Sequence, residues 1–438
     1  MDSVNKSEGL MRLAWMKLLN YDGPITGDKL KSAGILACLS VCFALEFDLS
    51  CLSTRLVQAT QVEWHLWICL VASPGLDSLL TVSGSEPFLA KAAEEILALS
   101  KKSATELLSH HKELNCIDHG QCGELVALLL LMQAHNMATK KDKASSDRGW
   151  VYVGDFMKAL LSQCEDQALF TALPAHYCLD KKDKSFETMF NDSKIWFNHI
   201  IKIEDGNMLH VSELWKFVSH GAMILCPPGQ YGVDIVIPVC FKGKELHRNN
   251  MTAILIQVKN AMHYQGKISS KLFNYMDPFD VGLFSNSDNP LPVIRLVFAL
   301  ASKVNKITVA PHPNCHHRDK FTAYDIWCAG TSPVTFRCIG TDLPSYLHLL
   351  EWSFQVNQAY DMVDVQGDHA PEEVALKGGD ARCQVWALAG PKRAHNYKYD
   401  KEEEEVEKEE AEPEEAEEEE AEVEDEDELN EKADNTSV

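Results

Sequence analysis

Two common enzyme motifs are missing from this chain. It has no phosphate-binding loop of the form G-x-x-x-x-G-K-[S/T], and it has no G-x-S-x-G nucleophile elbow. The first motif holds nucleotide phosphates on backbone N–H groups, and the second presents the nucleophile of many hydrolases. We therefore expect neither a nucleotide cofactor nor a serine or cysteine hydrolase of that kind.

Targeting and membrane signals are also missing. The first residues lack a basic cluster followed by a long apolar core, so no secretory signal is expected. The most apolar windows, 33–45 and 125–132, are shorter than the roughly 20 apolar residues that cross a bilayer. We predict a protein without a membrane span that is intracellular, in the nucleus or the cytoplasm, and not secreted.

The fourteen cysteines follow no framework of spacings, which favours a reducing compartment over a disulfide-bonded secreted protein. Cys38, Cys42 and Cys69 stand in apolar stretches that read as helices. A reduced thiol in such a place packs as a small hydrophobic group. We expect these three side chains to be buried.

Charge is distributed very unevenly along the chain. The net charge is −24, but residues 402–438 contain 22 of the 65 acidic residues and two of the 41 basic ones. The rest of the chain is therefore nearly neutral. Carboxylates at this density repel one another and bury nothing, which predicts a disordered polyacidic tail at 401–438. Such a tail is suited to binding basic proteins.

A length of 438 residues allows two or three domains. Residues 1–145 read as a helical amino-terminal region, with helix starts at Pro87 and near Gly123, and a polar linker is expected around 137–148. Short β-branched runs then predict an α/β domain at 149–355. An irregular extension at 356–400 is expected before the tail.

The segment 212–260 has the most informative pattern. Ser212 can cap a helix that begins at Glu213, and Gly221 can end that helix in a left-handed conformation. Runs rich in Ile and Val then predict strands, and a further strand is expected after a helical stretch. The four predicted strands are 222–226, 233–241, 251–258 and 293–300.

Polar residues inside these apolar strands suggest a functional site. Asp234 interrupts an apolar strand, where an unpaired carboxylate would be costly. Gln257 and Lys259 are two residues apart on the next strand, so they project from the same face. If the two strands are neighbours, all three side chains meet at one end of the sheet. Side-chain oxygens there could hold Mg²⁺, and the ammonium group could act on a phosphate.

These residues carry a family resemblance. Gly-Val-Asp at 232–234, followed by Gln-Val-Lys at 257–259, resembles the PD-(D/E)XK restriction-endonuclease-like superfamily, and most closely its Mrr-like branch with Q-x-K. The resemblance implies a restriction-endonuclease-like αβββαβ core. The wider stretch 120–345 also resembles a group of uncharacterised fungal proteins, which implies no activity.

The resemblance also implies roles for individual residues. Asp234, Gln257 and the carbonyl of Val258 would bind the metal, and Lys259 would act on the attacking water or on the phosphate. A glutamate on the preceding helix completes such sites. Glu213 matches that role, and Glu124 is the alternative.

Basic residues gather in the same part of the sequence. Residues 241–271 contain six basic side chains against the single acid Glu245. A basic surface around the site would suit the phosphate backbone of DNA. Besides Lys259, the candidate nucleic-acid contacts are Lys242, Lys244, Arg248, Lys267 and Lys271.

The leading hypothesis is therefore a Mg²⁺-dependent nuclease acting on DNA. The competing hypothesis is a non-catalytic interaction protein that keeps a nuclease-like sheet as a scaffold and binds basic partners through its acidic tail. The position of Asp234 relative to Gln257 and Lys259 separates the two hypotheses, because a metal site needs these side chains close together.

Overall fold

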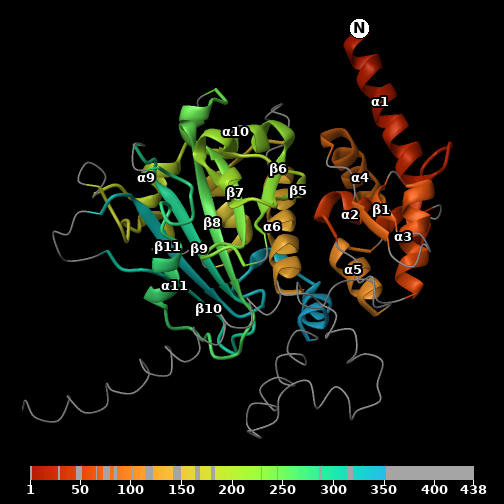
Figure 1. Ribbon diagram of the computed structural model, residues 1–438. Helices are drawn as coiled ribbons and strands as arrows, with labels where there is room; N and C mark the ends of the chain where they lie inside the picture. The colour runs from red at the N-terminus through yellow and green to blue at the C-terminus, as the bar shows by residue number, and fades with distance from the viewer. Residues whose placement is uncertain are drawn as a thin grey trace, which may run out of the picture. The chain divides into compact units, whose positions relative to one another are not determined.

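A computed structural model gives the fold (Figure 1). It describes residues 2–27, 30–45, 52–65, 67–72, 79–82, 86–100, 102–113, 122–141, 149–162, 168–178, 183–227, 229–243, 245–285, 289–312 and 319–351. The predicted extension at 356–400 and acidic tail at 401–438 lie outside these residues. Within them the protein is a mixed α/β fold, as predicted.

The amino-terminal part is mainly helical, with helices α1 (Asp2–Leu19), α2 (Ser32–Phe43), α3 (Leu52–Trp64), α4 (Pro87–Leu99), α5 (Ala104–Glu113) and α6 (Cys122–Lys141). It also contains an antiparallel pair of strands, β1 (Ile68–Ala72) and β2 (Leu79–Val82), that the sequence analysis did not predict. None of the described helices is long and apolar enough to span a membrane.

Three sequence predictions for this part can be compared with the structure. Cys38 and Cys42 are buried in α2 as expected, but the prediction for Cys69 is wrong, because it is exposed on β1. Pro87 is the first residue of α4, as its missing N–H favours. Helix α6 continues to Lys141, so the linker expected from residue 137 is helical at its start.

The rest of the described chain forms a nine-stranded sheet. Its strands are β3 (Val151–Tyr152), β4 (Lys194–Ile195), β5 (His199–Lys202), β6 (Ala222–Leu225), β7 (Ile235–Cys240), β8 (Met251–Lys259), β9 (Val293–Ala299), β10 (Lys306–Val309) and β11 (Ala323–Ala329). The helices of this part are α7 (Val153–Leu160), α8 (Ala168–Thr171), α9 (Phe186–Phe190), α10 (Val211–His220) and α11 (Ser270–Tyr275).

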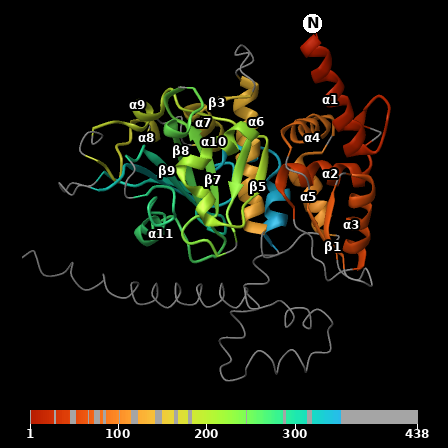
Figure 2. The ribbon, with the colours of Figure 1, turned by 45° about the horizontal axis from the view of Figure 1, so that its top comes forward.

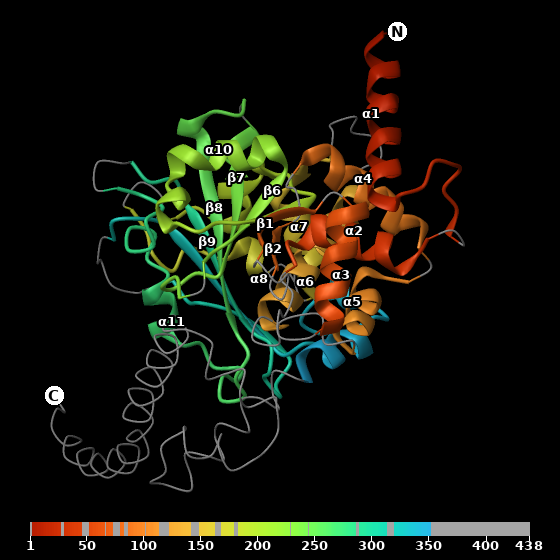
Figure 3. The same cartoon turned by 45° about the vertical axis from the view of Figure 1, so that its right-hand side comes forward.

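Four central strands follow one another in the order β6-β7-β8-β9. Strand β7 is antiparallel to both β6 and β8, whereas β9 is parallel to β8 and β11 is parallel to β9. The elements from α10 to β9 therefore run helix, strand, strand, strand, helix, strand. Figure 1 shows β7, β8, β9 and β11 side by side, with α10 near one end of these strands and α11 near the other, and Figure 3 shows β7, β8 and β9 in the same order.

Both faces of the sheet are covered by apolar side chains, which explains the unbroken Ile and Val runs. On one face, Ile235, Ile237, Ile254 and Ile256 belong to the same core as the apolar residues of α6. Figure 2 shows this helix near β5. On the other face, the core joins strand residues to one side of α10, and its members include Val236, Ala253, Leu255, Leu214, Phe217 and Val218.

Helix α10 begins at Val211, two residues earlier than expected. The residue before its first turn is His210, whose side chain accepts a hydrogen bond from the N–H of Ser212, so the predicted cap at Ser212 is wrong. An imidazole nitrogen here replaces the hydroxyl oxygen that usually fills this role. The helix ends at Gly221 in the left-handed conformation, as predicted.

Gly232 holds the turn before β7 against α11. Its φ is +74°, and a Cβ added there would overlap the carbonyl oxygen of Tyr275. A residue with a side chain would be strained by its backbone conformation and would also displace the end of α11. The glycine of the Gly-Val-Asp motif therefore has a clear structural reason.

We predict that Gly232→Ala lowers the free energy of unfolding by about 2 kcal/mol or more, since the left-handed conformation alone costs about 1–2 kcal/mol. Urea denaturation would measure this loss. Gly154→Ala in α7 is the matched control, because its Cβ would meet only a ring atom of Phe170 at 3.8 Å. A loss for Gly232→Ala no larger than for the control would contradict the assignment.

A buried ion pair links β9 to β11 beneath α11. Arg295 and Asp325 are 1% and 3% exposed, and the guanidinium donates two hydrogen bonds of 2.6 Å to the carboxylate. A third N–H donates to the carbonyl oxygen of Phe273 in α11 at 2.7 Å. The rings of Phe273 and Phe321 lie 5.6 Å and 5.3 Å from the guanidinium carbon. The pair therefore fixes α11 on the sheet.

Candidate metal and phosphate site

Asp234 lies just before β7 rather than inside it, because the strand begins at Ile235 and not at residue 233 as predicted. The paired residues of β7 and β8 end with Ile235 opposite Ile256, so Asp234 stands next to the residue pair that precedes Gln257. Its N–H donates to the carbonyl oxygen of Ile256 at 2.9 Å, and its Oδ2 accepts from the N–H of Val258 at 2.6 Å. The predicted condition that the two strands are neighbours is met.

Val258 turns its backbone toward this carboxylate. The N–H and C=O of one strand residue point to the same side of the strand. Since the N–H of Val258 bonds to Asp234, its carbonyl also faces the β7 side of β8. The structure thus brings the backbone of Val258 and the carboxylate of Asp234 together.

Gln257 is a buried polar residue without a described partner for its oxygen. It is 5% exposed, and its Oε1 accepts no hydrogen bond from any residue that the structure describes. An unsatisfied amide oxygen in a core costs about 1–3 kcal/mol. Strand alternation places it on the face that carries Ala253 and Leu255. A ligand or water at this oxygen would remove the penalty.

Lys259 is half-buried at the end of β8 and projects from the same face as Gln257. Its Nζ lies 5.8 Å from the ring centre of Tyr264, a buried residue of the segment that follows the strand. A cation over an aromatic face is stabilised by about 0.5–1 kcal/mol or more. The aromatic ring therefore helps to hold the ammonium group at this end of the sheet.

The two glutamate candidates differ in their surroundings. The carboxylate of Glu213 is 37% exposed, and it accepts hydrogen bonds from Ser212 and Lys216 of its own helix. The hydrogen bond from Lys216 lowers the pKa of Glu213. The described contacts of Glu213 thus lie on α10 itself, and none of them joins it to Asp234.

Glu124, in the first turn of α6, lies nearer the end of β8, although α6 covers the face opposite to that of Gln257 and Lys259. Its neighbour Gly123 lies against Asn260, the residue after Lys259, at 3.2 Å for a Cβ added at the glycine. Burial raises the pKa of the Cys226 thiol, and the carboxylates of Asp234 and Glu124 raise it further. Both carboxylates are therefore near one sulfur atom. The start of α6 and the Asp234 end of the sheet meet here.

The basic residues fall into two groups. Lys242 and Arg248 are exposed in the loop between β7 and β8, at the opposite end of these strands from Asp234. Six residues of β7 separate the two ends by about 20 Å. Lys267 and Lys271 follow the end of β8 and lie nearer Lys259. Lys244 is outside the described residues. The topology therefore does not produce one continuous basic surface around the site.

In the part of the chain that the structure describes, no three His, Cys, Asp or Glu side chains form a group that could hold a metal ion. The candidate donors at this end of the sheet are of another kind. They are the carboxylate of Asp234, the amide oxygen of Gln257 and the backbone of Val258. Oxygen donors of these types fit Mg²⁺, which takes one or two carboxylates and keeps several waters. The buried, unpartnered Oε1 of Gln257 supports that fit.

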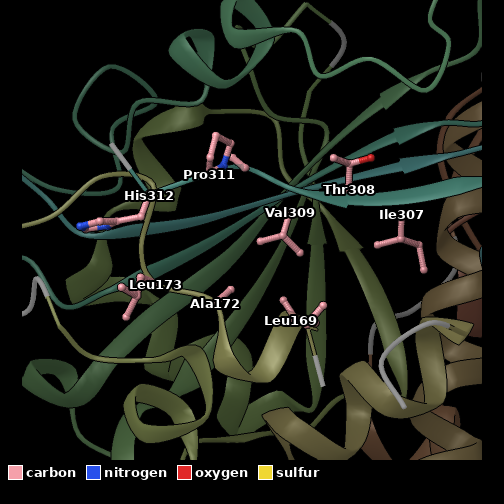
Figure 4. Close-up of a pocket in the computed structure, with 10 residues that line it drawn as sticks. Leu169, Ala172, Leu173, Ile307, Thr308, Val309, Pro311 and His312 are labelled. Atoms are coloured by element: carbon pink, nitrogen blue, oxygen red, sulfur yellow. The ribbon is translucent and has the colours of Figure 1, made fainter. Parts of the chain in front are cut away.

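A separate groove of about 440 Å³ lies between α8 and β10 (Figure 4). Its lining is mostly apolar and includes Leu169, Leu173, Ile307, Val309 and Pro311. Leu169, Ile307 and Val309 belong to the core on the α6 face of the sheet, whereas Gln257 and Lys259 project from the other face. The groove is therefore not part of the site at Asp234.

Comparison of the chain with family models, curated proteins and solved structures gave no match. The resemblance to the PD-(D/E)XK superfamily thus remains a prediction from the motif residues.

Proposed function

We propose that this protein is a metal-dependent phosphodiester hydrolase that acts on DNA, with its site at the end of β7 and β8. The observation that carries the proposal is that Asp234 bonds to Ile256 and Val258, the two residues that flank Gln257, and that Lys259 projects from the same face of β8 as Gln257. The element order from α10 to β9, which is that of an αβββαβ core, supports it as well.

The metal would be held by Asp234, Gln257 and the carbonyl of Val258, with Glu124 as the helix carboxylate in place of Glu213. When bound, Mg²⁺ lowers the pKa of a coordinated water and neutralises charge on the phosphate. The buried amide of Gln257 fits this role, because its oxygen lacks a described partner and needs one.

The protein's own residues supply orientation and charge. The hydrogen bond from Val258 fixes one oxygen of Asp234, so the carboxylate needs no rearrangement to act as a ligand. Lys259 provides a fixed positive charge that stabilises negative charge on the phosphate oxygens as the bond breaks. Burial of Gln257 and Tyr264 keeps bulk water from screening that charge.

One observation favours the alternative, a non-catalytic interaction protein with a nuclease-like sheet. The hydrogen bond from Val258 to Asp234 already gives this carboxylate a structural role at the end of the β7–β8 ladder. On this view Asp234 satisfies a backbone N–H that has lost its strand partner. The two functions predict opposite results in a cleavage assay.

The test is cleavage of plasmid, linear duplex and single-stranded DNA by the purified protein with Mg²⁺, with Mn²⁺ and with EDTA. We expect cleavage with either metal and none with EDTA, because Asp234 and Gln257 alone cannot activate water. Calcium is the matched control. It also binds oxygen ligands, but it does not keep the strict octahedral coordination of Mg²⁺. Cleavage that does not depend on a metal, or no cleavage of any DNA, would contradict the proposed function. The non-catalytic interaction protein would then be the better description.

A further inference from the structure

An exposed tyrosine, Tyr231, and a half-buried one, Tyr275, form an aromatic pair near Asp234. The ring centres of Tyr231 and Tyr275 are 4.8 Å apart, with an angle of 57° between the planes. Tyr231 is 37% exposed, which is high for a large aromatic side chain. Tyr275 ends α11, and the Nζ of Lys271 in the same helix lies 5.9 Å from its ring centre. The pair thus combines an aromatic surface with a positive charge.

The backbone holds this pair close to the candidate site. Tyr231 precedes Asp234 by three residues, a distance of about 10 Å at most for an extended chain. Between them, Gly232 packs directly on the carbonyl of Tyr275, so the turn and the end of α11 are fixed to each other. The Arg295–Asp325 pair fixes α11 on the sheet in turn. The exposed ring therefore has a defined position.

An exposed aromatic ring with nearby cations is a known means of binding nucleotides. Each base has a flat face that can stack on tyrosine, and lysines attract the adjacent phosphates. Bases inside a duplex are already stacked on both sides, so a surface ring can reach only a base that is unpaired or turned out of the helix. The separation of Lys242 and Arg248 from the site also removes the long basic surface that would suit a duplex.

We propose that Tyr231, supported by Tyr275, stacks on an unpaired base next to the scissile phosphate. The substrate class of the site is then a nucleic-acid single strand, or a duplex with unpaired nucleotides. This inference rests on the proposed function for the position of the scissile bond. The stacking is a property of binding and is measured without catalysis.

The experiment measures fluorescence anisotropy in EDTA with a labelled DNA strand, its blunt duplex and the RNA strand of the same sequence. Stacking contributes about 1–3 kcal/mol per base, so Tyr231→Ala is expected to weaken single-strand binding by about 5- to 140-fold. Tyr231→Phe keeps the ring and should bind as wild type does. The matched control is Tyr152→Ala, which removes a ring that is 38% exposed with Lys194 at 4.9 Å, at the other end of β7.

The inference is supported when Tyr231→Ala, and neither Tyr231→Phe nor Tyr152→Ala, binds the DNA strand or the RNA strand more weakly than wild type. The strand whose binding is weakened shows whether the site takes DNA or RNA. Equal affinity of wild type and Tyr231→Ala for both strands overturns it, and so does tighter binding of the duplex than of the strands. The proposed function fails in a different way. It fails when Tyr231-dependent binding is seen but no metal supports cleavage.

Discussion

Lys259→Ala is expected to lower the rate of DNA cleavage by about 100- to 1000-fold, the usual effect of removing one group that stabilises transition-state charge. Binding of DNA should weaken far less, because one lysine is a small part of the phosphate contacts. The melting temperature should change little, because a half-buried lysine at the end of a strand keeps its charged group near water. Single-turnover cleavage and thermal unfolding of the same preparation measure both effects.

Lys320→Ala is the matched control for this substitution. Its Nζ lies 5.9 Å from the ring centre of Phe279, against 5.8 Å for Lys259 and Tyr264, so both changes remove a similar lysine–aromatic contact. The control should cleave as wild type does. Asp234→Asn is the best companion, since its amide oxygen can still accept from Val258 while the charge is lost. Full activity in both Lys259→Ala and Asp234→Asn would assign the cleavage to another site or to a contaminant.

Asp325→Ala is expected to lower the free energy of unfolding by about 3–5 kcal/mol, because it leaves the charge of Arg295 buried without its partner. Such a loss is a large part of the stability of a typical domain. Urea denaturation of the full chain measures it. Most of this loss of stability comes from leaving the Arg295 charge buried without compensation, and less comes from losing its attraction to Asp325. Replacing both residues with apolar ones should therefore destabilise the protein less than Asp325→Ala does.

The double variant Arg295→Met with Asp325→Leu tests that reason, and it should recover at least half of the loss. Asp22→Ala is the control for an exposed pair. Its partner Arg12 is 3.2 Å away, and the two side chains are 61% and 71% exposed, so a change of at most about 1 kcal/mol is expected. A loss for Asp325→Ala as small as for Asp22→Ala would mean that Arg295 is hydrated or paired elsewhere.

Local sequence patterns predicted the central strands well. The expected strands 222–226, 251–258 and 293–300 differ from β6, β8 and β9 by one residue at one end, because each is a continuous apolar run buried on both faces. The strand at 233–241 was extended too far at both ends. Asp234 still bonds through its backbone to Ile256 and Cys226, but the regular pairing with β8 begins only at Ile235.

Tertiary placement was harder to predict. The motif spacing favoured Glu213, but which helix reaches the end of the sheet depends on contacts between segments far apart in the chain, such as Gly123 with Asn260. The Arg295–Asp325 pair was missed entirely. A signal existed, since each charge interrupts an apolar strand, but the pairing of β9 with β11 could not be read from either strand alone.

The free ends of the sheet bear on self-association. In the part of the chain that the structure describes, the hydrogen-bonded paths end in β10, β3 and β5, which have four, two and four residues. Each has a lysine on it or opposite it, namely Lys306, Lys194 and Lys202. Short edges with lysine offer few unpaired backbone groups and repel a second copy, so this sheet resists edge-to-edge aggregation although its centre is almost wholly apolar.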